Sequence, residues 1–229
     1  MVEAKIGKAV HAVLERVLAG VLLSVAKDEC ASDLATEEEL SKYDALCAKI
    51  PAFVERIDSF RRKNRVGRQL IEARLAVRSD FSPTQFYSGD AYLRGVLDVA
   101  YFYGDGNLAV VDHKTGARRA NVDVTEQLEA YAVLSVSTFK SAKRIWLGIH
   151  WVKDGEIEWA PPISRAEVNQ TLLPRVQAGV EAAALAVLEG PRTNPGSWCE
   201  WCNYRSVCPV GRELRFEPCD DYEVDPGVA

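Results

Sequence analysis

Apolar residues recur at three- and four-residue steps through the first part of the chain, over residues 4–27. That spacing places them on one face of a helix, so an amphipathic helix is predicted there. A polar break follows. A second helix is predicted to begin near Thr36, because the acidic run at 37–39 suits the positive end of a helix dipole. We expect it to continue to about Arg62, with an interruption at Pro51.

Strand-forming residues dominate the next section of the chain. Residues 69–79 partly alternate, residues 91–104 are rich in strand formers, and "YGDGN" predicts a hairpin into a strand over 108–114. Residues 123–139 predict a helix, in which Asp123 and Glu126 form a capping-box pattern. A second hairpin is predicted over 144–161. A long helix is predicted over 164–190, with Pro174 near a bend.

This order of elements predicts an α/β or α+β fold with a mixed central sheet flanked by helices. At 229 residues the chain is long enough for one domain with a substantial core. We expect a single domain over 1–229, with a helical part (1–68), a sheet core (69–163) and a C-terminal helix with a cysteine-rich segment (164–229). No apolar run approaches the ~20 residues that span a bilayer, and no signal-peptide pattern is present, so a cytoplasmic protein with no membrane partner is predicted.

Two short basic clusters stand out against a formal net charge of −5. Local clusters can bind phosphates whatever the total charge. The candidates for binding a nucleic-acid backbone are Arg61, Arg62, Lys63, Arg118 and Arg119. Solvated charge on a helix end and in a loop is the alternative for each cluster taken alone.

The residues with the clearest chemistry gather at the end of the strand that leads out of the first hairpin. Asp112 and Lys114 are two apart in a strand and therefore point to the same face. Asp98, on the preceding strand, comes near Asp112 if the two strands pair through the turn. Converging carboxylates repel each other unless a cation lies between them, and Mg²⁺ takes oxygen ligands of this kind. A surface ion pair is the alternative for Asp112 and Lys114 alone, and Glu72 fits a solvated face as well as the site.

The stretch "GVLDVAYFYGDGNLAVVDHKTG" resembles the core of the PD-(D/E)XK nucleases, specifically the RecB-like branch that includes CRISPR-associated adaptation nucleases and phage exonucleases. "GKAVHAVLE" resembles the amino-terminal helix motif of that branch, in which the histidine, here His11, is a metal ligand. "QLEAY" resembles its Q-x-x-x-Y motif and places Gln127 and Tyr131 on one helical face. "CEWCNYRSVCP" resembles its carboxy-terminal cysteine motif. The matches follow the family order from residue 7 to residue 209.

The resemblance implies a restriction-endonuclease-like core and a metal-dependent deoxyribonuclease, an exonuclease that acts in DNA recombination, repair or phage DNA processing. The implied ligands for Mg²⁺ or Mn²⁺ are His11, Asp98, Asp112 and the backbone carbonyl of His113. The implied catalytic residues are Asp98, Asp112, Lys114, Gln127 and Tyr131. The implied partner is DNA that is single-stranded or has single-stranded ends, with a helicase or recombination protein to unwind it.

Two alternatives belong to other functional classes. One is a catalytically inactive nucleic-acid-binding or assembly factor with this fold and a structural iron–sulfur or zinc site. The other is a zinc-ribbon interaction protein, in which the cysteines carry the function. The ordered amino-terminal motifs and the intact acid, acid and lysine set favour the nuclease over both.

Three of the six cysteines lie together near the C-terminus: Cys199, Cys202 and Cys208. In a chain predicted to be cytoplasmic this favours metal binding over a disulfide framework. Thiolates suit iron–sulfur clusters and zinc, and the spacing does not separate the two. The resemblance implies a [4Fe–4S] cluster, with zinc as the alternative.

The family normally places the fourth cluster cysteine before the histidine helix, and no cysteine precedes Gly7 here. Three explanations stay open. Cys30, Cys47 or Cys219 substitutes, with Cys30 favoured because it lies in a polar break; an upstream segment is missing; or the cluster has been lost.

Overall fold

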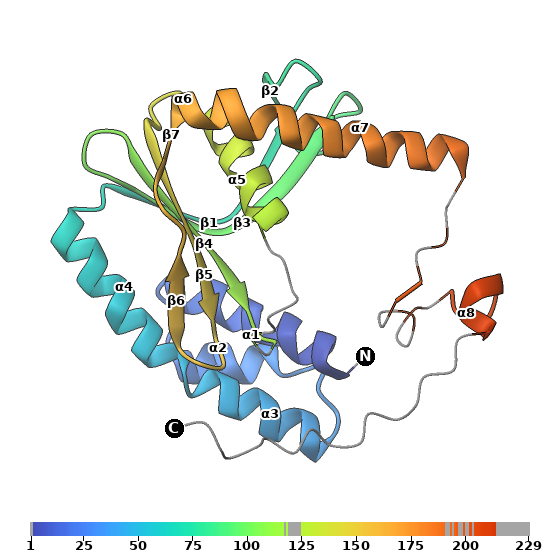
Figure 1. The fold of residues 1–229 in the computed structure, drawn as a ribbon. Helices are drawn as coiled ribbons and strands as arrows, with labels where there is room; N and C mark the ends of the chain where they lie inside the picture. The colour runs from blue at the N-terminus through green and yellow to red at the C-terminus, as the bar shows by residue number, and fades with distance from the viewer. Residues whose placement is uncertain are drawn as a thin grey trace, which may run out of the picture. The chain divides into compact units, whose positions relative to one another are not determined.

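The computed structural model describes residues 2–116, 118, 125–190, 193, 195–196, 199, 202 and 204–213. The chain divides into two compact units, residues 1–180 and 181–229, which are described one at a time. The first unit carries the sheet (Figure 1). The predicted catalytic residues, from Asp98 to Tyr131, also belong to this unit. The expectation of a single domain over the whole chain stays a prediction.

Four helices precede the sheet within the described residues 2–67: α1 (Val2–Leu18), α2 (Leu23–Cys30), α3 (Glu37–Cys47) and α4 (Ile50–Asn64). The prediction of one continuous helix over 4–27 was wrong. Gly20 adopts a left-handed conformation (φ 97°), and its amide and that of Val21 bond to the carbonyls of Val17 and Arg16. This motif ends α1, because glycine takes a positive φ without a steric penalty.

The second predicted helix is confirmed, together with its interruption. The hydroxyl of Thr36 accepts a hydrogen bond from the amide of Glu39, and the Glu39 carboxylate accepts one from the amide of Thr36. This reciprocal cap begins α3. The helix stops at Cys47 and restarts as α4 with Pro51 in its first turn, where proline lacks only a donor that has no helical partner.

Among the described residues, seven strands form one sheet in the order β2-β1-β3-β4-β5-β6, with β7 paired to β5. The strands are β1 (Arg68–Val77), β2 (Pro83–Thr84), β3 (Leu93–Tyr103), β4 (Asn107–Lys114), β5 (Arg144–Trp151), β6 (Glu156–Trp159) and β7 (Ile163–Ser164). β4 and β5 pair in parallel and are joined through α5 (Thr125–Thr138), whereas the other pairs are antiparallel. The mixed sheet and both predicted hairpins are confirmed.

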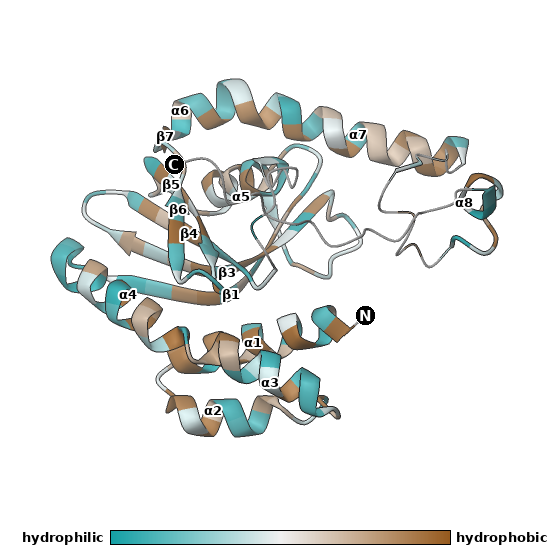
Figure 2. Cartoon of the chain, turned by 60° about the horizontal axis from the view of Figure 1, so that its bottom comes forward, coloured by the Kyte–Doolittle hydropathy of each residue, from teal (hydrophilic) through white to brown (hydrophobic). Residues whose placement is uncertain are grey.

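The two faces of the sheet pack against different helices (Figure 2). One apolar core joins α1, α3 and α4 to residues such as Val99 and Val111. A second core joins α5 to residues such as Leu97 and Val110. Successive side chains of β4 therefore alternate between the face covered by α1, α3 and α4 and the face covered by α5. Because both faces are covered, β4 is almost fully buried.

The alternation of β1 and β3 is broken at a single point. Ile71 packs on the α1 side but Ala73 on the α5 side, although residues two apart in a strand normally share a face. β3 shows the same change across Asp98, and the register places Glu72 opposite Asp98. Glu72 has a φ of 49°, a strained conformation for a side chain of this size. The break brings two carboxylates to one place in the sheet.

The long helix predicted over 164–190 is present but not regular. Ser164 caps the short α6 (Arg165–Glu167), a π-helical segment follows (η1, Val168–Leu172), and α7 (Leu173–Glu189) continues it. The wider π-helical turn lies directly before Pro174, which has no N–H to donate and would crowd a regular turn. The Arg165 guanidinium donates to three carbonyls at and beyond the end of α5: Val136, Phe139 and Ala142.

Within the described part of the chain, Arg165–Glu189 is the one helix long and apolar enough, by length and composition, to cross a membrane. Reading the sequence for unbroken apolar runs did not identify it. One such helix is weak evidence for a membrane span. Arg175 within it forms an ion pair with the nearly buried Glu129 of α5, 3.0 Å apart, which ties this helix to the fold.

Candidate active site

β4 extends beyond its antiparallel neighbour, and this overhang creates the site. Pairing with β3 ends at Val99 and Val111, whereas pairing with β5 continues to Lys114. The amide of His113 is therefore left without a strand partner and donates instead to Asp98 Oδ2, at 2.7 Å. The predicted approach of Asp98 to the end of β4 is thus present, through a side-chain bond that replaces a sheet bond.

Four polar side chains form a connected network at the end of β4. Lys114 Nζ lies 2.8 Å from Asp112 Oδ2 and donates to Gln127 Oε1 at 2.8 Å. Gln127 Nε2 in turn donates to Asp112 Oδ1 (3.0 Å) and to the Tyr131 hydroxyl (2.6 Å). The i, i+4 spacing on α5 places Gln127 and Tyr131 on one face, and the side-chain amide of Gln127 bonds there to both Lys114 and Asp112.

A glycine on β3 allows α5 to approach this network. A Cβ at Gly95 would lie 2.6 Å from Leu134 Cδ1 and 3.5 Å from the Tyr131 ring. A side chain at this position would crowd Leu134 of α5, which is fully buried.

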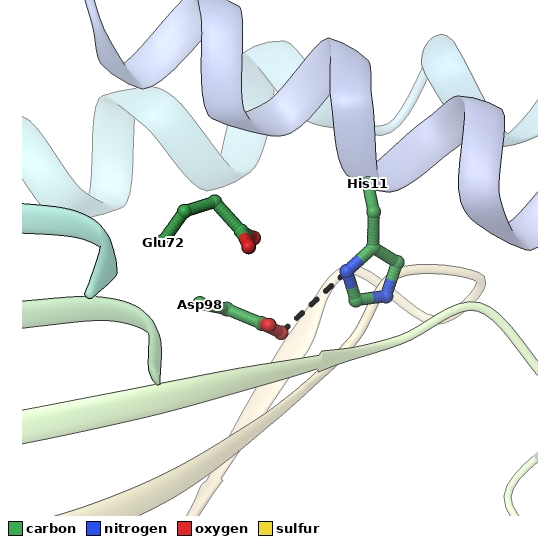
Figure 3. Close-up of side chains that lie close together, drawn as sticks. All are labelled: His11, Glu72 and Asp98. Atoms are coloured by element: carbon green, nitrogen blue, oxygen red, sulfur yellow. Dashed lines mark ion pairs between the residues drawn. The ribbon is translucent and has the colours of Figure 1, made fainter. Parts of the chain in front are cut away.

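A second group lies beside the network, where α1 crosses the break in β1 and β3 (Figure 3). One ligand atom from each of His11, Glu72 and Asp98 lies within 4.8 Å of the others. His11 Nδ1 is 3.6 Å from Asp98 Oδ2. Figure 3 shows the Glu72 carboxylate directed toward the same space as the imidazole of His11. Three elements far apart in sequence therefore supply one nitrogen and two carboxylates to one point.

Burial dominates the electrostatics of these groups. It raises the pKa of Asp98 to about 7 and, with the Asp98 charge as a smaller cause, raises the pKa of Glu72. Burial also lowers the pKa of His11, which favours its neutral form. Two carboxylates that are difficult to ionise beside a neutral imidazole form a site whose charged state needs an added cation.

The donor set fits a divalent metal. Asp112 Oδ2 is buried, and Lys114 Nζ lies 2.8 Å from it in an ion pair. Carboxylate oxygens at the edge of a cavity are the ligands that hard divalent cations prefer. The predicted ligands His11 and Asp98 come together, Asp112 lies on the same cavity, and the structure adds Glu72 to the group.

These groups line a cavity of about 590 Å³. Lys8 and Thr115 also line it, and the sequence reasoning missed both. Lys8 lies three residues before His11 and so on the same side of α1, which is a signal that the sequence contained. The cavity thus combines carboxylates, an imidazole and two lysines.

Residues 1–209 match the PD-(D/E)XK nuclease superfamily. The chain belongs to this superfamily. No curated protein matches it. A solved structure titled "Crystal structure of SSO0001" is similar with a TM-score of 0.40 and 14% identity, covering 92% of this chain and 85% of that one. The restriction-endonuclease-like core predicted from the sequence is confirmed by the superfamily match and the mixed sheet flanked by helices.

In this PD-(D/E)XK nuclease, the His113 side chain lies on the other face of β4 from Asp112 and Lys114, as alternation predicted. Its Nδ1 is 2.9 Å from Nδ1 of His150, and the His150 ring stacks on Phe53 at 3.9 Å between centroids. Burial is the largest cause that lowers the pKa of both imidazoles, to about 4 for His150. His113 therefore offers the site its backbone carbonyl, while its ring packs edge-on against the His11 ring with 6.0 Å between centroids.

None of the four predicted DNA-binding residues that the structure describes lines the cavity. Arg61 pairs with Asp58, Arg62 bonds to Ser59, and Lys63 is exposed at the end of α4. Arg118 pairs with Glu158. Arg119 lies outside the described residues.

The three clustered cysteines belong to the second unit, where all three are free thiols. The amide of Cys202 donates to the Cys199 carbonyl, which closes the C-x-x-C turn. The amide of Gly211, in the short α8 (Pro209–Glu213), donates to Cys208 Sγ at 3.3 Å. A sulfur that accepts an amide bond suits a thiolate ligand.

The candidates for a fourth ligand differ in their surroundings. Cys30 is half-buried at the last position of α2, rather than in the polar break that the sequence predicted. Cys47 is buried, and burial raises the pKa of its thiol to about 11, as expected for a core residue. Cys219 lies outside the described residues, as does the predicted helix cap Asp123.

Proposed function

We propose that this superfamily member is a divalent-metal-dependent deoxyribonuclease of the RecB-like branch and acts as an exonuclease on DNA with single-stranded ends. The observation that carries the proposal is the cavity itself: buried carboxylates and an imidazole converge on one point, and a lysine is held at the same edge by Asp112 and Gln127. Recombination, repair or phage DNA processing, with a helicase partner for duplex, is the setting that we infer.

The metal ligands in this proposal are His11, Asp98, Asp112 and the backbone carbonyl of His113, with Glu72 as a further carboxylate. A bound Mg²⁺ or Mn²⁺ would polarise the phosphate and lower the pKa of a bound water. The ligands come from α1, β1, β3 and β4, and the break at Glu72 and Asp98 turns both carboxylates toward α1.

Lys114 has a role separate from that of the metal ligands. Its ammonium lies beside the Asp112 carboxylate, where its positive charge offsets the negative charge that develops on the phosphate during hydrolysis. Gln127 fixes the ammonium in position through its carbonyl and fixes Asp112 through its amide nitrogen. Lys8 of α1 also lines the cavity and supplies a second cation for the phosphate backbone.

The test is digestion of end-labelled single- and double-stranded DNA in Mg²⁺, Mn²⁺ or EDTA. The natural protein should cleave only with metal, and Lys114→Ala should reduce the rate roughly 10²- to 10³-fold. Lys49→Ala is the matched control, because Lys49 is exposed between α3 and α4 and is free of ion pairs in the described structure. A product ladder that shortens from one end supports an exonuclease.

Two outcomes would contradict the proposal. Cleavage that survives EDTA or the loss of Lys114 would exclude this chemistry at this site. A folded, metal-supplied protein that binds DNA without cutting it would favour the inactive binding factor.

We also propose that Cys199, Cys202 and Cys208 hold a [4Fe–4S] cluster or zinc in a cytoplasmic protein. The five described cysteines are free thiols, which suits a reducing compartment. Protein prepared without oxygen should carry iron with a visible thiolate-to-iron band, or stoichiometric zinc, and Cys202→Ser should lose it. A colourless sample free of both metals would refute the site.

A further inference from the structure

A strip of the sheet that carries two exposed arginines, Arg74 and Arg94, continues from the metal group along β1 and β3. The register pairs Arg74 with Val96 and Ala76 with Arg94. Their side chains point to the α1 side, since the alternating neighbours pack on the α5 side. Val96 lines the cavity, and Arg74 is a diagonal neighbour of Asp98, so their Cα atoms are roughly 7–8 Å apart. The strip therefore begins at the cavity wall.

The loop after β2 places two aromatic rings over this strip. The guanidinium carbon of Arg74 lies 5.9 Å from the ring centroid of Phe86 and 5.7 Å from that of Tyr87. The Arg74 guanidinium also donates to the Tyr87 hydroxyl at 3.0 Å. Tyr87 nevertheless remains 75% exposed. Arg74, Phe86, Tyr87 and Arg94 are called here the aromatic–arginine platform.

The platform is held in place before any ligand binds. Arg78 forms an ion pair with Asp90 at 2.6 Å and donates to the Pro83 carbonyl, also at 2.6 Å. Arg94 donates to the Ser88 carbonyl at 2.7 Å, next to Tyr87. Figure 1 shows β2 and its flanking turns at this end of β1 and β3. Ordering the loop therefore adds little to the free-energy cost of binding.

The two arginines have charge available for an anion. Both are exposed, and neither forms an ion pair within the described residues. Their bonds to a hydroxyl and a carbonyl orient the guanidinium groups without neutralising them. A planar guanidinium both binds phosphate oxygens and stacks on ring faces.

We propose that the aromatic–arginine platform binds an unpaired polynucleotide strand and guides it to the metal group. Bases stack on Tyr87, and Arg74 and Arg94 bind consecutive backbone phosphates. This inference rests on the proposed nuclease function and adds the binding surface that selects the strand. Tyr101 is fully buried and Phe102 packs on the core, so neither ring offers such a surface.

An unpaired strand fits this surface better than a duplex for a chemical reason. Within a duplex each base face is covered by its neighbours, so an exposed tyrosine ring finds no free face. An unpaired strand offers free base faces together with phosphates, and the platform has both a ring and two cations.

The test measures binding and cleavage separately. Fluorescence anisotropy of a labelled oligothymidylate of about 16 nucleotides, and of a duplex of the same length, is recorded with the full chain in EDTA. Tyr87→Ala should weaken single-strand binding about tenfold, while Tyr87→Phe should stay within about twofold because it keeps the ring. Arg94→Ala should lower the slope of log Kd against log salt by about 0.7. Lys49→Ala, which removes an exposed charge elsewhere, should change neither.

Three results would overturn the proposal, and they are distinguishable. If Tyr87→Ala binds the oligothymidylate as the natural protein does while cleavage is intact, the platform is refuted and the nuclease stands, leaving the exposed ring to a protein partner. If duplex binding falls as much as single-strand binding, selection of an unpaired strand is refuted. If the natural protein neither binds nor, with metal, cuts DNA, the proposed function fails and the platform fails with it.

Discussion

Replacing Asp98 with asparagine should make the metal-free protein more stable. The Asp98 side chain is 13% exposed, and its pKa is raised from 3.8 to about 7, chiefly by burial. The folded state therefore holds the Asp98 proton more tightly than the unfolded state does. The shift of about three pKa units corresponds to about 4 kcal/mol of stability that is present at low pH and lost once Asp98 ionises.

The sign of the pH dependence follows from the raised pKa. At about pH 4 and below, Asp98 is protonated in the folded state, so the natural protein and Asp98→Asn should have similar unfolding free energies. The difference should grow as the pH rises toward 7 and level off above it. Asparagine keeps the oxygen that accepts from the His113 amide, so the change removes the charge and leaves the local bond.

Urea unfolding followed by tryptophan fluorescence, in EDTA and at several pH values, measures this difference. Asp154→Asn is the matched control, because Asp154 is exposed in the turn between β5 and β6, and its replacement should change stability by less than about 0.5 kcal/mol. Mn²⁺ should stabilise the natural protein more than the variant, since binding only the folded state raises stability. A variant less stable than the natural protein at pH 8 in EDTA, or a difference independent of pH, would refute the reasoning.

Three further predictions concern packing, catalysis and the buried histidines. Gly95→Ala should lower the unfolding free energy by about 1–3 kcal/mol, because its Cβ would lie 2.6 Å from Leu134; unchanged urea unfolding would contradict this. Gln127→Ala should lower the cleavage rate roughly 10- to 100-fold with little change in KM, because Lys114 and Asp112 lose the side chain that positions both. Steady-state kinetics would measure this, and a change in KM alone would indicate a substrate contact instead. The pKa of His150 is lowered to about 4, so the unfolded state takes up a proton at a higher pH than the folded state does. The free energy of unfolding should therefore fall as the pH drops from about 6.5 to 4. In urea titrations His150→Asn should make that fall less steep, and an equally steep fall would contradict the prediction.

Local periodicity explains the parts of the site that the sequence predicted correctly. Asp112 and Lys114 share a face because side chains in a strand repeat every two residues, and Lys114 Nζ lies 2.8 Å from Asp112 Oδ2. Gln127 and Tyr131 meet because a helix repeats every 3.6 residues, and they are hydrogen-bonded. The cap of α3 and the hairpin before β4 follow from neighbouring residues in the same way. These features need no information from distant parts of the chain.

Other parts were decided by tertiary structure alone. Glu72 fitted a solvated face equally well by alternation, and only the break shared with β3 turns it toward His11. The close contact of His113 with His150 joins residues 37 apart, through the parallel pairing of β4 and β5. The position of Tyr87 over Arg74 depends on how the loop after β2 folds back.

The division has a physical reason. Which residues share a strand or helix face can be predicted from sequence, because it depends on backbone geometry over a few residues. Which faces meet depends on strand register, on where one strand outlasts its neighbour and on which helix covers the gap. The end of β4 is such a case, because β3 no longer pairs with it there and the Asp98 side chain accepts the free amide hydrogen bond instead. As a result, a common D-x-K pattern lies at a cavity in the folded chain.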